Sequence, residues 1–261
     1  MDLCEGKIIE SEAIGDNIYR LIVQQPVLAL AEPGQFVMVA CGPVGTLRRP
    51  FTIGKASSDP SRFEMWILAE GPGAKWVVSQ QPGSMLDMIG PLGQGFQLPQ
   101  EGRLLALLED RHISPIHRLL DRLDSRSIPN MHLLIVGERA RKAHEHVQKD
   151  FENAGVRTTV LYGSQSELEE IVLRYIQDHQ IEYVAAACGA AWLKAFSPLD
   201  RDGSTVIEMS LETQMVCGIG ACLGCTIPLH EAQHGGNMAG GFDYKPLCTE
   251  GPVIRARRVV I

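Results

Sequence analysis

The chain has 261 residues, of which 45% are hydrophobic and 21% are charged, and its formal net charge is −7. This composition is typical of a globular protein that is long enough for two domains and a small appendage. The acidic balance disfavours a nucleic-acid partner, and no apolar run is long enough to cross a bilayer. The chain start does not resemble a signal peptide and seven is an odd number of cysteines, so we expect a cytoplasmic protein without a disulfide scaffold.

Residues 1–100 are predicted to form an antiparallel β-barrel. Alternating or β-branched runs are separated by turn clusters such as Pro33-Gly34 and Gly71-Pro72-Gly73. Short strands with turn signals between them are typical of a closed barrel. The expected strands cover residues 7–12, 17–24, 35–40, 62–69 and 85–89.

The string Arg49-Pro50-Phe51-Thr52 is a candidate flavin-binding strand. Arg49 could hold a pyrophosphate through charge-assisted hydrogen bonds, while Pro50 fixes the backbone. Phe51 and Thr52 could then lie along a flat ring, with the Thr52 hydroxyl bonded to it. The same string also fits a surface arginine beside an edge strand.

Residues 70–76 lead from a strand through a glycine turn into a short helical stretch. The amides at the beginning of such a helix can bind a phosphate. A plain turn without a ligand is an equally good interpretation of this segment.

Residues 101–205 are predicted to form a doubly wound, nucleotide-type α/β domain, because strands and helices alternate. The apolar run 103–108 reads as a strand buried on both faces. Ser114-Pro115 is the expected N-cap and first residue of the next helix, and Ser166-Glu167-Leu168-Glu169 is the expected capping box of a later one. Further strands are expected at residues 132–136, 158–162 and 183–187.

The turn after the first of these strands is unsuited to a dinucleotide. It runs from Leu108 to Pro115 without a glycine, and it carries Glu109 and Asp110. A pyrophosphate needs close backbone approach and positive potential. One carboxylate ~4 Å from a phosphate oxygen costs about 4 kcal/mol at an effective dielectric constant of ~20. We therefore expect no ordinary NAD(P)H binding in this turn, although Arg111 and His112 could offset part of the repulsion.

Residues 206–261 contain a cysteine pattern that is typical of iron–sulfur ligation. Cys217, Cys222 and Cys225 follow a C-x4-C-x2-C spacing, and Cys248 comes after a long loop. This is the plant-type [2Fe–2S] arrangement, and the interleaved glycines allow the tight backbone that it needs. A structural zinc site is the alternative, but zinc sites more often combine two C-x2-C-like pairs.

The loop before Cys248 contains His230 and His234 at a spacing that could bind a metal on a helix. The glycines at 235–236 and 240–241 favour a mobile loop with surface histidines instead. Four cysteines already complete one cluster, so no histidine ligand is required.

With these three parts in this order, the chain resembles the electron-transfer subunit of class 1B (NAD-dependent) dihydroorotate dehydrogenase, in the ferredoxin reductase superfamily. The resemblance covers the whole chain and is strongest at the flavin strand and at the cysteine segment, where Ser210, Glu212, Met215 and the four cysteines match. It implies FAD in the barrel and a [2Fe–2S] cluster near the C-terminus. The implied FAD contacts are Arg49, Pro50, Phe51, Thr52, Trp66, Ile67, Leu68, Gly73 and Ala74, and the implied iron ligands are Cys217, Cys222, Cys225 and Cys248.

Three departures from the family pattern stand out. Ala74 replaces a threonine of the family, and the loop before Cys248 is longer than usual. The glycine-rich nucleotide turn of the family is replaced by the acidic turn at 108–112, and its later Cys-Gly-Pro motif remains only as Cys188-Gly189-Ala190. The nucleotide site is therefore expected to be degenerate.

The resemblance implies an electron-transfer subunit of an oxidoreductase complex in pyrimidine biosynthesis. Its expected partner is a flavin-containing catalytic subunit that oxidises dihydroorotate, in a hetero-oligomer with two of each chain. Because direct NAD(P)H use is not expected, ferredoxin or another redox protein is the second expected partner.

Three alternatives remain open. The chain could be the small subunit of an NAD(P)H:ferredoxin or sulfide dehydrogenase-type flavin reductase, although such chains can place an aspartate among the cluster ligands. It could keep NAD-dependent activity through an unusual nucleotide pose. It could also be a non-catalytic iron–sulfur redox sensor, which would show no turnover with any donor.

Overall fold

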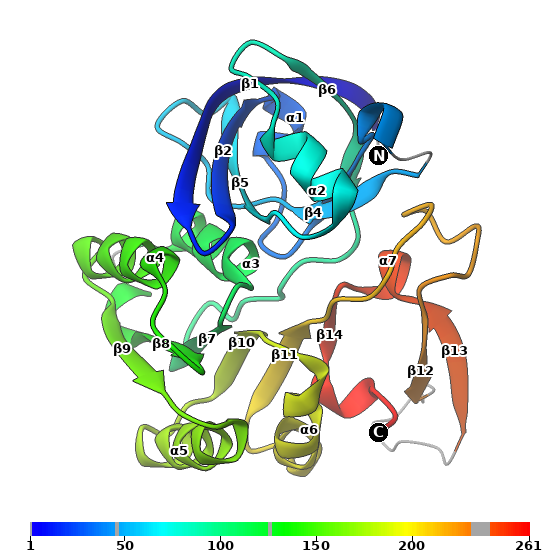
Figure 1. The fold of residues 1–261 in the computed structure, drawn as a ribbon. Helices are drawn as coiled ribbons and strands as arrows, with labels where there is room; N and C mark the ends of the chain where they lie inside the picture. The colour runs from blue at the N-terminus through cyan, green and yellow to red at the C-terminus, as the bar shows by residue number, and fades with distance from the viewer. Residues whose placement is uncertain (1, 45–46, 125–126, 231–240) are drawn as a thin grey trace.

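The computed structural model describes residues 2–44, 47–124, 127–230 and 241–261. Two six-stranded sheets and one two-stranded sheet make up the fold, with the first sheet above the other two in Figure 1. Within the described residues, no helix is long and apolar enough to span a membrane. The glycines 235–236 and His234, for which the sequence predicts a mobile loop, lie outside the described residues.

The first sheet is the predicted antiparallel barrel. Its strand order is β4-β3-β6-β1-β2-β5. The barrel closes where the segment after β4 meets β5: the Gly54 amide donates to the Glu64 carbonyl at 2.8 Å, and the Glu64 amide donates to the Lys55 carbonyl at 2.8 Å. The elements are β1 (Asp2–Gly15), β2 (Ile18–Gln24), α1 (Pro26–Ala29), β3 (Phe36–Val39), η1 (Gly42–Val44), β4 (Arg49–Thr52), β5 (Arg62–Leu68), α2 (Gly71–Val78) and β6 (Met85–Leu92).

The second sheet is the predicted α/β sheet, with the order β14-β11-β10-β7-β8-β9. All neighbours are parallel except the edge strand β14. Within this sheet, the first strand in the sequence is β7, and β8 and β9 follow it toward one edge. The next strand, β10, lies on the other side of β7. The strand order therefore reverses between β7 and β10. The strands are β7 (Leu104–Glu109), β8 (Met131–Gly137), β9 (Arg157–Tyr162), β10 (Tyr183–Ala187), β11 (Val206–Ser210) and β14 (Val253–Arg255).

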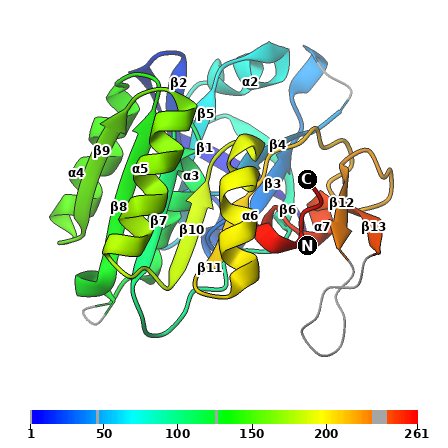
Figure 2. The same cartoon turned by 90° about the horizontal axis from the view of Figure 1, so that it is seen from below.

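Helices cover both faces of this sheet. Side chains alternate along a strand, so Leu107 packs with α5 and α6, whereas Leu108 packs with α3 and α4. Figure 2 shows α5 and α6 together on one side of the sheet. The strands are buried on both faces, which explains their continuous apolar sequences. The helices are α3 (Ile113–His117), η2 (Arg118–Arg122), η3 (Ile128–Asn130), α4 (Lys142–Asn153), α5 (Gln165–Asp178), η4 (Ala190–Trp192) and α6 (Leu193–Asp202).

Two predicted helix caps are wrong. Helix α3 has His112 as its N-cap, and the Ser114 hydroxyl instead accepts a hydrogen bond from the Trp66 amide at 3.2 Å. The Ser114 hydroxyl, which the local sequence predicts as the cap of α3, is thus bound to the barrel. In α5 the capping box begins at Ser164, whose extended backbone lets Glu167 reach back to its amide, so Ser166 lies inside the helix.

The segment 206–261 does not stand apart from the second sheet. Its strands β11 and β14 complete that sheet, and buried Asp200 of α6 holds them there. The Asp200 carboxylate accepts from the Ile207 amide at 3.1 Å, from the Arg257 amide at 2.9 Å and from the Arg255 guanidinium. The remaining elements, β12 (Thr226–His230), β13 (Phe242–Pro246), α7 (Leu247–Glu250) and η5 (Ala256–Arg258), complete the C-terminal part.

A polar contact fixes the barrel against the α/β sheet. Buried Arg118 in η2 donates to the backbone carbonyls of Ala29, Ala31 and Gly54, which all belong to the barrel. Next to it, His117 lies between two carboxylates, as described below. Buried Arg118 and His117 thus contact groups on the other side of the boundary between the two sheets.

Candidate functional site

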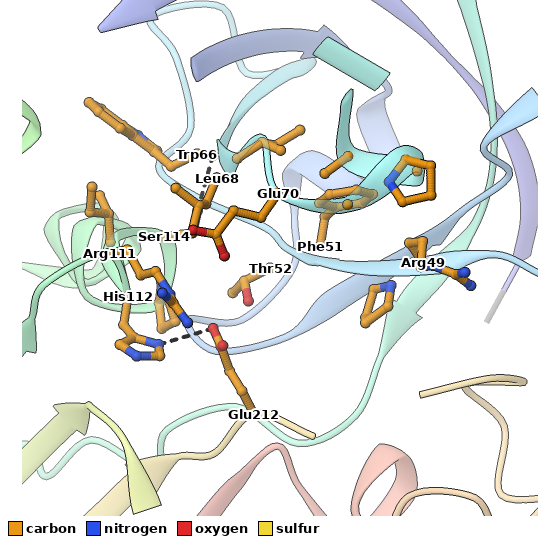
Figure 3. A pocket seen from close by; sticks show the side chains of 18 residues that line it. Arg49, Phe51, Thr52, Trp66, Leu68, Glu70, Arg111, His112, Ser114 and Glu212 are labelled. Carbon is orange, nitrogen blue, oxygen red and sulfur yellow. Dashed lines mark hydrogen bonds and ion pairs between the residues drawn. The ribbon is translucent and has the colours of Figure 1, made fainter. Parts of the chain in front are cut away.

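A cavity of about 320 Å³ lies between the barrel and the α/β sheet (Figure 3). The barrel contributes β4, the end of β5 and the first turn of α2. The opposite wall comes from the first turn after β7 and from the segment after β11. All nine predicted FAD contacts line this cavity, namely Arg49, Pro50, Phe51, Thr52, Trp66, Ile67, Leu68, Gly73 and Ala74.

Arg49 and the beginning of α2 form one end of the cavity. A Cβ atom added to Gly73 would lie 3.0 Å from Cγ of Arg49 and 3.1 Å from Sγ of Cys41, so a larger residue would push these side chains aside. Helix α2 has no side-chain cap at Glu70. Its first amides and the Arg49 guanidinium therefore offer positive charge and donors at the same place, which suits a phosphate.

The strand β5 contributes to the cavity through its backbone at Trp66. The Trp66 indole points away from β4 in Figure 3 and donates to the Glu64 carboxylate at 2.9 Å. The Ile67 side chain is buried in the barrel core. A ligand along this strand would thus meet main-chain groups and the Leu68 side chain, because alternate side chains point to opposite faces.

The opposite wall of the cavity carries an ion pair that the sequence analysis did not predict. The imidazole Nδ1 of His112 lies 3.0 Å from the Glu212 carboxylate, and Arg111 lies beside them. Burial lowers the pKa of His112, but the Glu212 carboxylate outweighs burial and raises it above the ordinary value. Glu212 is noted in the sequence only as a residue shared with the family, and its contact with His112 spans 100 positions. Only the tertiary fold could reveal it.

The acidic turn before His112 is tied to other parts of the sheet. The Glu109 carboxylate accepts from the Gly189 amide at 2.6 Å and from the Trp192 indole at 2.7 Å. Asp110 has a positive φ of 49°, and its carbonyl oxygen lies 2.7 Å from the His144 Nε2. The Glu109 side chain is therefore bound to the loop after β10, and the Asp110 backbone is bound to α4, while both residues remain partly exposed.

The four predicted iron ligands lie in two segments that fold together. Backbone amides donate to the sulfur atoms: Gly220 to Cys248 at 3.1 Å, and Gly224 to Cys222 at 3.4 Å. The loop also packs closely on the barrel, because a Cβ on Gly218 would lie 2.5 Å from Cγ of Met38 in β3. Amides directed at sulfur are suited to thiolates in a cluster.

The Cys217 side chain interacts with Cys222, and the Cys248 side chain interacts mainly with Cys225 and also with Cys217. In the described parts of the chain, no group of three or more His, Cys, Asp or Glu side chains is arranged around a single ion position. Two pairs of thiolates are what two irons require, since each iron of a [2Fe–2S] centre takes two protein ligands.

The thiols differ in acidity. Burial raises the pKa of Cys217, but the amides of Ile219, Cys222 and Ala221 outweigh this and lower it to about 6. Burial and the neighbouring Cys225 raise the pKa of Cys248 to about 12. The amides around Cys217 thus favour its thiolate, whereas burial disfavours the thiolate of Cys248.

His230, one of the two histidines noted in the sequence, ends β12, and its Nε2 lies 3.2 Å from the Arg201 guanidinium. It therefore faces a cation in this structure. Its predicted companion His234 lies outside the described residues.

The cavity and the cysteine segment are joined through a short stretch of chain. Glu212 lines the cavity and Cys217 is the first cysteine, so the connection runs from residue 212 to residue 217. A chain of this length spans at most about 18 Å even when fully extended. The two candidate sites are therefore close neighbours.

Comparisons with known proteins agree with this arrangement. The family model for the iron-sulfur cluster binding domain of dihydroorotate dehydrogenase B matches residues 212–260. The chain is 32% identical over 262 aligned residues to the dihydroorotate dehydrogenase B (NAD(+)) electron transfer subunit of Bacillus cereus (strain Q1), and the alignment covers 97% of each chain. The corresponding subunit of Bacillus anthracis (strain CDC 684 / NRRL 3495) matches with the same identity and coverage.

Solved structures show the same fold at lower sequence identity. The structure of an NADH-dependent reduced ferredoxin-NADP oxidoreductase aligns with a TM-score of 0.75 at 19% identity, covering 98% of this chain and 89% of the other. A ferredoxin reductase in carbazole 1,9a-dioxygenase aligns with a TM-score of 0.62 at 16% identity, covering 78% and 66%. From the identity and coverage of its relatives, this chain belongs to the family of dihydroorotate dehydrogenase B electron transfer subunits, which has a ferredoxin-reductase-like fold.

Proposed function

We propose that this chain carries electrons between a catalytic flavoprotein subunit of the dihydroorotate dehydrogenase type and an external redox partner. It would hold FAD in the cavity beside β4 and a [2Fe–2S] cluster in the segment of Cys217 to Cys248. The observation that carries the proposal is the junction of the two sites through residues 212–217, because electron transfer requires cofactors that are close together.

The cavity fits FAD at its phosphate end. Arg49 and the uncapped start of α2 supply donors and positive potential, and Gly73 leaves room for the backbone to approach. Thr52 and the β5 backbone at 66–68 would lie along the flavin ring. Ala74 keeps its backbone amide, so the loss of the family's threonine hydroxyl is tolerable.

The cysteine segment fits a [2Fe–2S] centre. Cys217 and Cys222 would hold one iron, and Cys225 and Cys248 the other, as their pairing suggests. The amides of Gly220 and Gly224 already point at sulfur atoms. When bound, FAD exchanges electrons in pairs and the cluster exchanges them singly, so the chain would connect a two-electron couple with a one-electron carrier.

The protein's own contribution is position and electrostatics. The three segments around the cavity hold the ligand between the barrel and the α/β sheet, and the His112–Glu212 pair closes the far wall. Gly218 brings the cysteine loop onto β3 of the barrel. These contacts fix the separation and orientation of the two sites.

The relatives are electron transfer subunits by name, so a partner subunit completes the enzyme. We propose a cytoplasmic hetero-oligomer with two copies of each chain, acting in pyrimidine biosynthesis. The catalytic subunit would carry its own flavin and oxidise dihydroorotate.

We further propose that this chain does not take electrons directly from NAD(P)H, although its relatives are named for NAD(+). The support is the acidic turn, whose Glu109 and Asp110 are held where a pyrophosphate would need positive potential. Ferredoxin or another redox protein would then be the external partner.

An anaerobic titration tests this proposal. The cofactor-loaded chain is mixed with NADH or NADPH, and the FAD absorbance band is followed. We expect no prompt bleaching with either nucleotide, and bleaching when dihydroorotate is added in the presence of the catalytic subunit. Prompt bleaching by NADH or NADPH alone would overturn the donor part of the proposal. Failure with dihydroorotate and a competent partner would overturn the pathway.

A further inference from the structure

The strand order of the α/β sheet identifies one point at which a ligand is expected. In open α/β sheets, ligands bind at the carboxyl ends of the strands, where the strand order reverses. Here the order reverses between β7 and β10, so this point lies between Glu109, which ends β7, and Gly189, which follows β10. Any dinucleotide bound in the usual way would have to reach it.

The Glu109 side chain already occupies this point. One carboxylate oxygen accepts from the Gly189 amide at 2.6 Å, and the other accepts from the Trp192 indole at 2.7 Å. Trp192 itself is fully buried. The donors that an anionic ligand would use at this loop are thus taken by a carboxylate of the chain.

The space beside the neighbouring glycines is taken as well. A Cβ on Gly189 would lie 3.3 Å from the Glu109 carboxylate, and a Cβ on Gly137, at the end of β8, would lie 2.6 Å from the Asp110 carboxylate. Glycines after β8 and β10, the two strands that flank β7, would otherwise leave room for a ligand to approach the backbone. In this chain, acidic side chains fill that room.

Three polar residues of the turn, Glu109, Asp110 and His112, are each bound to a different element, which opposes its movement. Glu109 is bound to the loop after β10, Asp110 to Arg141 and His144 near the start of α4, and His112 to Glu212 after β11. Opening the crevice would break contacts with all three elements at once. The closed state is therefore built into the fold.

We infer that Glu109 is a specificity-determining residue that keeps dinucleotides out of the crevice between β7 and β10. The inference rests on the proposed function, and it attributes the absence of direct NAD(P)H use to one side chain. A carboxylate within ~4 Å of a phosphate oxygen lowers affinity by up to about a thousandfold at an effective dielectric constant of ~20. Asp110, held beside Gly137, adds charge of the same sign.

The test measures binding and does not depend on turnover. Binding of NADH and NADPH to the cofactor-loaded chain is measured by equilibrium dialysis for the wild type, Glu109→Gly and Glu138→Gln. Glu138 follows β8 at the same edge of the sheet and is exposed, so its variant removes a neighbouring charge without opening the crevice. A change in tryptophan emission that occurs in Glu109→Gly but not in Glu138→Gln reports whether the Trp192 indole has lost its carboxylate partner, because Trp66 and Trp76 are the same in both variants.

We expect weak binding by the wild type and by Glu138→Gln, and binding that is about tenfold tighter or more in Glu109→Gly. If Glu109→Gly does not fold, Glu109→Ala provides the same comparison. A folded Glu109 variant without any gain would overturn the inference and leave the proposed function intact. Tight binding by the wild type would also overturn it, and the flavin titration would then decide the donor separately.

Discussion

Arg48 and Arg49 are adjacent in the sequence but make different contacts. Arg48 forms an ion pair with Asp87 at 2.7 Å, next to the barrel surface. Arg49 lines the cavity, and among the residues that the structure describes its guanidinium donates to the backbone carbonyls of Leu47 and Arg48, within its own segment. Its charge is thus available to a phosphate.

We predict that Arg49→Met weakens FAD binding about tenfold to a hundredfold, because a charge-assisted hydrogen bond contributes about 1.5–3 kcal/mol. Flavin fluorescence during dialysis measures the dissociation constant. Arg48→Met removes the same charge one position away and serves as the control, with little expected change. Equal losses in both variants would show that net charge matters and that Arg49 has no special contact.

At the scale of residues, the sequence predicted which residues line the cavity, but it did not predict the contacts of each side chain. All nine predicted FAD contacts share one cavity, yet the Trp66 indole is bound to Glu64 on its own strand. The acidic turn was expected to repel a nucleotide, whereas its bonds to Gly189 and Trp192 were not foreseen. Such contacts join residues about 80 positions apart, which local patterns do not encode.

At the scale of elements, the cysteine loop depends on the barrel beneath it. Gly218 has a positive φ of 74°, and a Cβ there would lie 2.5 Å from Cγ of Met38. Gly83 also has a positive φ, of 95°, but a Cβ there would meet nothing within 4 Å. A side chain at Gly83 would thus cause backbone strain alone, whereas one at Gly218 would cause both strain and steric overlap.

We predict that Gly83→Ala lowers the free energy of unfolding by about 1 kcal/mol through backbone strain alone. Gly218→Ala should lower it by about 2–4 kcal/mol, because overpacking against Met38 is added to the strain. Urea-induced unfolding of the cofactor-loaded chain measures both values. A loss in Gly218→Ala no larger than that in Gly83→Ala would contradict the close packing.

Most strands of the barrel and of the α/β sheet were predictable from sequence to within a few residues, whereas β11, β12, β13 and the helix caps were not. Strand β10 lies where its apolar run predicts it, at Tyr183–Ala187. Ser114 was expected to cap α3, but its hydroxyl is bound to the Trp66 amide of the barrel. A serine can bond either to its own helix or to a neighbouring strand, and only the tertiary structure decides between them.

At the scale of the whole molecule, a buried histidine joins the two sheets. His117 lies between Asp150 of α4, with Nε2 at 2.9 Å from the carboxylate, and Glu64 of β5, at an ion-pair distance of 3.3 Å. Burial lowers the pKa of His117, but the two carboxylates raise it above the ordinary value even though Lys55 opposes them. The pKa of each carboxylate is lowered in turn, despite burial, by the histidine.

The direction of each shift determines the pH dependence of stability. The protonated His117 stabilises the fold fully below its ordinary pKa near 6.5, and this contribution is lost as the pH rises through its raised pKa. We predict that the free energy of unfolding falls by about 1 kcal/mol or more between weakly acidic and alkaline pH. In His117→Gln this slope should be smaller, with the part due to His112 remaining, whereas the full slope should persist in His146→Gln. Urea unfolding at several pH values provides the measurement, and an unchanged slope in His117→Gln would refute the role of this histidine.

The order of the three parts was evident in the sequence, whereas the way they share a sheet was not. Strands β11 and β14 come from the segment that carries the cysteines, but they complete the α/β sheet through Asp200. A buried carboxylate that joins three segments leaves no periodic signal, so sequence patterns could not reveal this connection.

The central claim is that one chain holds both a flavin and a two-iron cluster. The most direct measurement is the iron, zinc and flavin content of the chain purified without oxygen, together with its visible spectrum. The account predicts two irons and one FAD per chain, and loss of the iron in Cys222→Ser. A colourless protein with a single zinc and no FAD would contradict it.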